Sequence, residues 1–194
     1  YTINNSVFKN CWSDKEAGAI YLSNNGAGTS KLSSDLIVVN SKFINNTAKA
    51  LGTQNNYGGG AVQVKEATNV LIKNVTFINN TANMGGAISI TQARDSSYNN
   101  TVLNCTFIGN NATTGNGGSI CAGKADKSVD RPKLYDLIIS DSHAGNLGGG
   151  IYAQEITDYR NLTFIGNNAN QGGGLYWDKE GITIEKMVFI NNTS

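Results

Sequence analysis

Apolar and polar residues alternate in six short segments of the chain, and each segment follows a glycine-rich stretch. The first and third residues of the segments are nearly all apolar, which is typical of a strand with one buried face. Stacked on one another, these residues predict two interior columns, with Trp177 beside Ala153 in the second. The segments are IYL (20–22), VQV (62–64), ISI (88–90), ICA (120–122), IYA (151–153) and LYW (175–177).

A second motif, an aromatic residue with asparagine three positions later, alternates with the glycine stretches along the whole chain. Its spacing of roughly 21 to 36 residues is, at the short end, the length of one coil of a parallel β-helix. We therefore expect one all-β solenoid domain over 1–194, with about seven coils and with loop insertions at 23–35 and 123–133. The copies are FKNC (8–11), FINN (43–46), FINN (77–80), FIGN (107–110), HAGN (143–146), FIGN (164–167) and FINN (189–192).

Stacking of the coils predicts ladders of identical side chains. The aromatic residues should stack inside the coil, and the asparagines should form hydrogen-bonded ladders at its corners. His143 takes the aromatic position of its copy, so the letters Asp141-Ser142-His143 are not expected to form a catalytic triad. The aromatic ladder is Phe8, Phe43, Phe77, Phe107, Phe164 and Phe189. The corner ladder is Asn46, Asn80, Asn110, Asn146, Asn167 and Asn192, and a second polar ladder is Asn5, Asn40, Asn74, Asn104 and Asn161.

The composition of the chain argues against several classes of function. A net charge of +1 with 15% charged residues gives no electrostatic basis for binding nucleic acid. No apolar run approaches the roughly 20 residues needed to cross a bilayer, so this segment is not expected to insert into a membrane. Cys11, Cys105 and Cys121 allow at most one disulfide and match no zinc-site spacing. Calcium and phosphate motifs do not occur either, and we expect no cofactor.

The alternating GGA[ILV] and FxxN tetrapeptides resemble the repeats of the chlamydial polymorphic outer-membrane proteins and of adhesin-like surface proteins. The resemblance covers essentially the whole chain, and the copy at 77–88 matches best. It implies a right-handed parallel β-helix in an exported protein displayed at the cell surface. Cys11, His143 and the AGAI at 17–20 depart from the pattern. The chain opens and stops within the repeat, so we expect it to be a fragment of a longer surface protein.

The resemblance favours an extracellular adhesin without enzyme activity. Tyr21, Tyr152 and Tyr176 occupy the outward position of one strand and are the candidate binding face, unless an insertion covers them or they stack on each other. The expected partner is a protein or glycan on another cell surface, or further coils or subunits of the same assembly.

Two alternative functions stay open. The first is a structural stalk, or a subunit of an extracellular fibre or coat. The second is a polysaccharide lyase or hydrolase, which would use paired acids near Glu155, Asp178 and Glu180.

N-glycosylation would suit an exported protein. Most of the many N-x-S/T sequons repeat with the ladder motif, whereas Asn99 and Asn111 lie nearer turns and are the candidate glycosylation sites.

Overall fold

The computed structural model describes residues 1–23, 35–49, 58–65, 67, 69–91, 99–123, 132–154, 157–178 and 183–194. All regular structure in these residues is β, with 21 strands and no helix, which confirms the all-β class. Most of the two expected insertions, residues 24–34 and 124–131, lie outside the described residues. No helix that could span a bilayer is found in the part of the chain that the structure describes.

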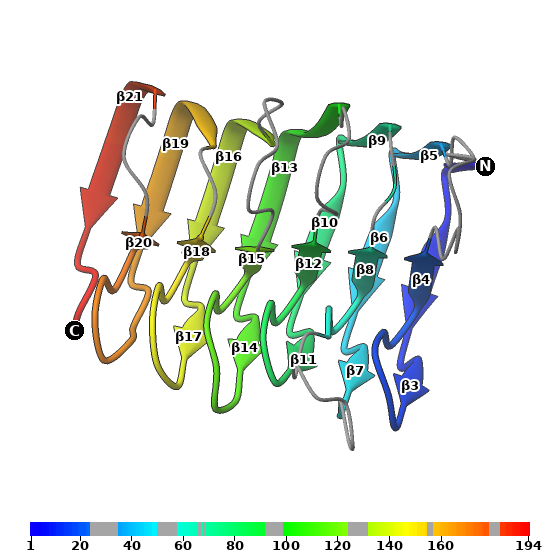
Figure 1. The fold of residues 1–194 in the computed structure, drawn as a ribbon, viewed down its shortest axis with the longest axis horizontal. Coiled ribbons are helices and arrows are strands. Elements are labelled where there is room, and N and C mark those ends of the chain that lie inside the picture. Colours follow the sequence, from blue (N-terminus) through cyan, green and yellow to red (C-terminus); the bar gives the residue numbers. More distant parts are fainter. Residues whose placement is uncertain are drawn as a thin grey trace, which may run out of the picture.

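The strands form three sheets that run along the long axis of the molecule, so that equivalent strands of successive coils lie side by side (Figure 1). Every pairing between named strands is parallel. The arrangement is that of a parallel β-solenoid.

The first sheet is the longest and contains β1 (Thr2–Asn4), β2 (Val7–Lys9), β5 (Asp35–Val39), β6 (Lys42–Ile44), β9 (Asn69–Lys73), β10 (Thr76–Ile78), β13 (Asn99–Ile108), β16 (Lys133–Ser140), β19 (Asp158–Ile165) and β21 (Thr183–Ile190). The second contains β3 (Trp12–Ser13), β7 (Thr47–Ala48), β11 (Thr81–Ala82), β14 (Asn111–Ala112) and β17 (His143–Ala144). The third contains β4 (Ile20–Ser23), β8 (Val62–Lys65), β12 (Ile88–Thr91), β15 (Ile120–Gly123), β18 (Ile151–Ala153) and β20 (Leu175–Trp177).

Register follows the repeat residue by residue. Ile88 of β12 pairs with Val62 and with Ile120, so the alternating segments form the predicted aliphatic columns. Trp177 lies beside Ala153, but it is 47% exposed and does not fill the interior as expected. Trp177 lies in β20, the last strand of its sheet among the described residues, where β18 is the strand that pairs with it.

The backbone has a positive φ at two corners of the coils, and again in the glycine stretches at Gly85, Gly117, Gly148 and Gly172. This left-handed conformation is strained for most side chains, whereas Asn and Gly tolerate it. The repeated asparagines therefore meet a backbone requirement as well as forming ladders. The first corner holds Asn5, Asn40, Asn74, Asn104, Asp136, Asn161 and Lys186, and the second holds Asn10, Asn45, Asn79, Gly109, Asp141, Gly166 and Asn191.

One glycine of each glycine stretch is required by close approach between coils. A Cβ at Gly86 would collide with the carbonyl oxygen of Gly118 in the next coil, and a Cβ at Gly118 would collide with that of Gly149. Only a residue without a side chain allows the coils to stack at this point.

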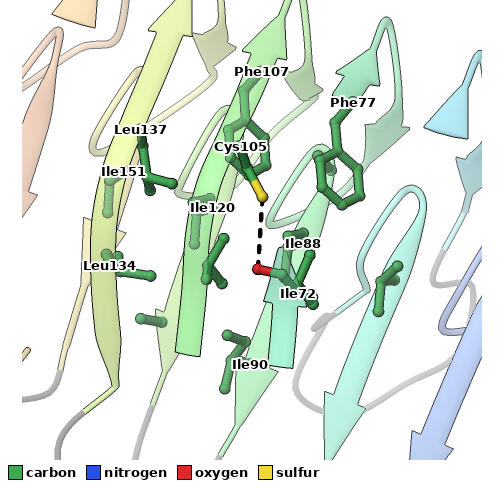
Figure 2. Close-up of a cluster of buried hydrophobic side chains, with 14 of the residues drawn as sticks. Ile72, Phe77, Ile88, Ile90, Cys105, Phe107, Ile120, Leu134, Leu137 and Ile151 are labelled. Atoms are coloured by element: carbon green, nitrogen blue, oxygen red, sulfur yellow. Dashed lines mark hydrogen bonds between the residues drawn. The ribbon is translucent and has the colours of Figure 1, made fainter. Parts of the chain in front are cut away.

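The interior is filled by aliphatic and aromatic side chains from facing sheets. Figure 2 shows Ile72 and Phe107 of the first sheet pointing toward the same interior as Ile88 and Ile120 of the third. Cys105 also points inward, and its thiol donates to the Leu103 carbonyl at 3.2 Å and to the Ile72 carbonyl at 3.6 Å. Full burial of each large side chain stabilises the fold by about 1.5–3 kcal/mol.

Candidate functional site

The aromatic ladder is the central feature of the interior. Rings of neighbouring coils stack nearly parallel, with centroids 4.7 Å apart for Phe8 and Phe43 and 4.8 Å apart for Phe77 and Phe107. Phe164 stacks on Phe189 in the same way at 4.8 Å. The four rings of Phe43, Phe77, Phe107 and Phe164 are fully buried, so they serve stability and offer no contact to a ligand.

The aromatic ladder changes at β16, where the residue in the aromatic column is not the expected His143. Ile139 pairs with Phe107 on one side and with Phe164 on the other, so Ile139 occupies the aromatic column. His143 is exposed instead, and its Nδ1 lies 2.9 Å from Oδ1 of Asn168. The expectation that His143 is a core residue is therefore wrong. Ser142 is buried between the exposed Asp141 and His143, so the three do not form a relay.

The buried asparagine ladder joins successive coils through their amides. The backbone N–H and the Nδ2 of Asn46 both donate to Oδ1 of Asn80, at 3.0 and 2.9 Å. Asn80 donates in the same two ways to Asn110, and Asn167 to Asn192. At the first coil, the backbone N–H of Cys11 donates to Asn46 Oδ1, so Cys11 stands at the corner as expected.

The ladder does not include Asn146. That residue is exposed and donates from Nδ2 to Asn116 Oδ1 at 2.9 Å. Ser142 takes the corner position, and its backbone N–H donates to Asn167 Oδ1 at 3.0 Å. The distance to the next glycine stretch could have revealed this: Asn80 precedes Gly85 by five residues, whereas Asn146 precedes Gly148 by only two.

A second asparagine ladder runs along the exposed first corner. Asn74 Nδ2 donates to Asn40 Oδ1 at 3.1 Å, and Asn104 Nδ2 donates to Asn74 Oδ1 at 2.8 Å. In the first coil the acceptor is Asn4 and not the expected Asn5. Asn161 donates to Asp136 at 2.9 Å.

The three candidate tyrosines do not form an exposed strip. Tyr152 is only 6% exposed and stacks on Tyr176 with ring centroids 5.8 Å apart. Its neighbours in register are Cys121 and Tyr176, and the turn at Gly148 lies against its backbone. Tyr21 is exposed but lies in β4, four strands away in the same sheet. Tyr152 is therefore not a surface contact residue, and the alternative expectation, that Tyr152 and Tyr176 stack on each other, is confirmed.

An exposed uncharged face lies on the first sheet instead. It is made by the outward residues on either side of the buried aromatic column, and we name it the Thr–Ile face. Sequence reasoning missed it, although the pattern Thr-Phe-Ile signals it directly. Ile138 is 49% exposed and Ile108 is 37% exposed. The face consists of Thr76, Thr106, Ile138, Thr163 and Val188 in one column and Ile78, Ile108, Ser140, Ile165 and Ile190 in the other.

Of the three acids considered for catalysis, Asp178 lies among the described residues. Asp178 is exposed, and its backbone N–H donates to the Ala153 carbonyl at 3.0 Å. Glu155 and Glu180 lie outside the described residues. The described residues also contain no group of three or more His, Cys, Asp or Glu side chains that could hold a metal ion.

The two candidate glycosylation sites differ in accessibility. Asn99 is exposed at the start of β13, where its Oδ1 accepts from Lys133 Nζ at 3.0 Å. Asn111 is half-buried, and its Oδ1 is shielded from solvent without a hydrogen-bond donor. Glycosylation of either residue stays a prediction.

All three cysteines are free thiols. Cys11 is half-buried, whereas Cys105 and Cys121 are buried. Burial raises the pKa of both buried thiols to about 12, so neither is a reactive thiolate at neutral pH.

A family model for the Chlamydia polymorphic membrane protein (Chlamydia_PMP) repeat matches residues 74–91. That segment contains one complete copy of the scaffold, from the exposed corner asparagine through the aromatic residue, the buried asparagine and the glycine pair to β12. None of the curated proteins and none of the solved structures matches the chain.

Proposed function

We propose that this chain is the display scaffold of an adhesin at the cell surface, outside the cell. In this proposal the solenoid is right-handed, has about seven coils and acts by binding without catalysis. The match of residues 74–91 to a membrane-protein repeat supports the surface location. The observation that carries the binding role is the Thr–Ile face, because it exposes aliphatic side chains in a regular array.

The side chains of the Thr–Ile face favour one class of binding partner. None of its ten side chains is charged, so it does not suit acidic glycans, nucleic acid or anionic lipid. It also contains no aromatic ring on which a sugar could stack. An uncharged protein surface on another cell is the partner that matches it, because Ile and Thr methyl groups gain most by removal from water.

The size of the face predicts weak binding by one copy. Five strands spaced about 4.8 Å apart give a length of about 19 Å, and the face is two residues wide. Such a patch is far smaller than the about 800 Å² per partner that a standard stable interface buries. Display of many copies on one cell would convert weak contacts into stable attachment through avidity.

A matched pair of substitutions tests the contact face. The chain is coupled in many copies to beads, and retention of cells is counted. Thr106→Lys places a charge within the Thr–Ile face, whereas Thr101→Lys places it on the same strand outside that face, at an equally half-buried threonine. We expect Thr106→Lys to abolish retention and Thr101→Lys to preserve it.

The other outcomes point to the alternatives. Equal loss or equal retention in both variants would refute the Thr–Ile face as the contact. Retention that a soluble glycan blocks would identify a glycan partner. No retention of any cell type, together with self-association of the beads, would favour the stalk or fibre subunit. Cleavage of a polysaccharide that is lost on Asp178→Asn would favour the enzyme.

A further inference from the structure

We propose that the solenoid contains a built-in joint at which it parts into two blocks before either block unfolds. The joint lies between the β13 coil (residues 99–123) and the β16 coil (residues 132–154). This inference concerns the scaffold itself and does not depend on the proposed function. Three separate side-chain ladders are interrupted at this one interface.

The first interruption is in the aromatic stack. Four rings stack continuously from Phe8 to Phe107, at 4.7, 5.1 and 4.8 Å. The next position is Ile139, which pairs with Phe107 but offers no ring. Stacking resumes only with Phe164 on Phe189. The aromatic stack is therefore interrupted at both interfaces of β16, the joint with β13 and the following interface with β19, and the asparagine ladders distinguish the two.

The second interruption is in the buried asparagine ladder. Asn80 donates its N–H and Nδ2 to Oδ1 of Asn110, but the next corner residue, Ser142, has no amide oxygen to receive the same two bonds from Asn110. Asn110 Nδ2 donates instead to Ser119 Oγ within its own coil, at 3.2 Å. Among the described side chains at this corner, a hydroxyl contact of 2.7 Å between Ser119 and Ser142 crosses the joint, beside the backbone bond from the His143 N–H to the Asn110 carbonyl at 2.9 Å.

The third interruption is in the exposed asparagine ladder. Asn104 donates back to Asn74, and its own Oδ1 would need a donor from the β16 coil. That position holds Asp136, whose ionised carboxylate only accepts. Asp136 accepts from Asn161, so it is coupled to the following coil and not to the preceding one.

The backbone pairing does not compensate for these losses. Seven residue pairs are in register between β13 and β16, and seven also between β19 and β21. The second of these interfaces has both a stacked Phe pair and two buried amide bonds. Because a solenoid's stability is approximately a sum of coil terms and nearest-neighbour interface terms, side chains decide which internal interface opens first.

Among the described residues, two further side-chain bonds across the joint are exposed: Asn146 Nδ2 donates to Asn116 Oδ1, and Lys133 Nζ donates to Asn99 Oδ1. Asn116 Oδ1 also accepts from the part-buried backbone N–H of Leu147 at 3.2 Å. Water competes with the exposed bonds, so they hold the coils together less strongly than buried ones.

The joint also crosses the Thr–Ile face. Thr76 and Thr106 lie on one block, and Ile138, Thr163 and Val188 lie on the other. If that face makes the contact proposed above, parting at the joint divides it, so mechanical load would release the partner while most of the scaffold stays folded. Only this consequence rests on the proposed function.

Three equivalent glycine amides report on three successive interfaces. Gly118 N–H donates across the joint to the Gly148 carbonyl at 3.0 Å. Gly86 N–H donates to Gly117, one interface earlier, and Gly149 N–H donates to Gly172, one interface later, both at 3.1 Å. Hydrogen exchange of the full chain, followed by NMR in low urea, measures the opening of each interface directly.

We expect Gly118 to exchange at least about tenfold faster than Gly86, which corresponds to about 1.4 kcal/mol. The repair variant Ile139→Phe/Ser142→Asn should slow Gly118 to the rate of Gly86. The transplant variant Phe77→Ile/Asn80→Ser places the same pair of residue types in another coil. It should create a second interface between coils that opens before the blocks unfold. Equal rates for the three amides in the unmodified chain would overturn the proposal. If the repair variant does not fold, an unchanged exchange pattern in the transplant variant would overturn it equally.

Discussion

The buried asparagine ladder gives the sharpest prediction about stability, and Asn80 is its best test position. Asn80 Oδ1 accepts from the N–H and Nδ2 of Asn46, and its Nδ2 donates to the Phe43 carbonyl at 3.1 Å and to Asn110 Oδ1 at 3.0 Å. The side chain is fully buried. Asn80→Ala removes all four bonds, while its backbone N–H can still donate to Asn110.

The magnitude follows from the groups left without partners. Asn46 Nδ2 keeps its bond to the Phe8 carbonyl, so the two groups that lose a buried partner are the Asn46 N–H and the Phe43 carbonyl, which loses its side-chain donor. Each unsatisfied buried group costs about 1–3 kcal/mol. We expect Asn80→Ala to lower the free energy of unfolding by about 2–6 kcal/mol, a large share of the about 5–15 kcal/mol typical of a folded protein.

Urea unfolding followed by circular dichroism measures this loss. Asn69→Ala is the matched control, because Asn69 also donates its amide to a neighbouring coil, to Asp35 Oδ1 at 2.7 Å, but does so on the surface. The control should change stability by no more than about 0.5 kcal/mol. If the two substitutions lower the free energy of unfolding by similar amounts, burial is not what makes the asparagine ladder stabilising, and the reasoning is refuted.

Three further predictions concern the packing of the solenoid. Gly86→Ala should lower stability by about 1–3 kcal/mol or more because its Cβ would strike the backbone of the next coil. Gly109→Asn, at a positive-φ corner where other coils carry Asn, should change the urea midpoint little, because the new Cβ meets the end of the Asn79 side chain, which can rotate away. Because burial raises the pKa of the Cys105 and Cys121 thiols to about 12, the unfolded chain alone loses these protons from about pH 9 upward. The thiols' contribution to the free energy of unfolding should therefore be fully present below pH 9. It should fall by up to about 1.4 kcal/mol per pH unit per thiol toward pH 12. Urea titrations at pH 7 and 10 should show a weaker pH dependence for Cys121→Ala than for the unmodified chain. Asn100→Val should raise the unfolding free energy by about 1–3 kcal/mol, because both amide atoms of Asn100 are buried without partners; an unchanged or lower midpoint would contradict this.

The sequence was sufficient to predict the strands and most of the ladders because each depends on a residue type that few others can replace. An interior column requires apolar side chains at every second position, and a positive-φ corner favours Asn or Gly, which occupy most of these corners. These requirements recur in every coil, so the repeat itself shows which positions are internal. Phe77 and Asn80 could therefore be placed from the sequence alone, and the structure has them in the ladders expected.

The error at the β16 coil arose because the residues there satisfy the same physical requirements with different letters. Ile139 fills the interior as an aliphatic side chain, and Ser142 supplies a short polar group at the corner, so neither matches the motif by letter. His143 and Asn146 match it by chance four residues later. The burial of Tyr152 could not be predicted for another reason: alternation places its side chain on the outward face of the strand, and the repeat does not show what packs against that face.

The same reasoning limits what the family match says about function. Within residues 74–91, Phe77, Asn80 and Gly86 are internal, so their recurrence is explained by the fold. The outward residues beside the aromatic column face solvent and are free to differ between coils: Lys42, Thr76 and Ile138 all occupy one column, on β6, β10 and β16. In the proposed function, binding specificity must therefore be carried by residues that the scaffold does not constrain. The Thr–Ile face is such a set, because its ten members stay uncharged over five strands although the fold does not require it.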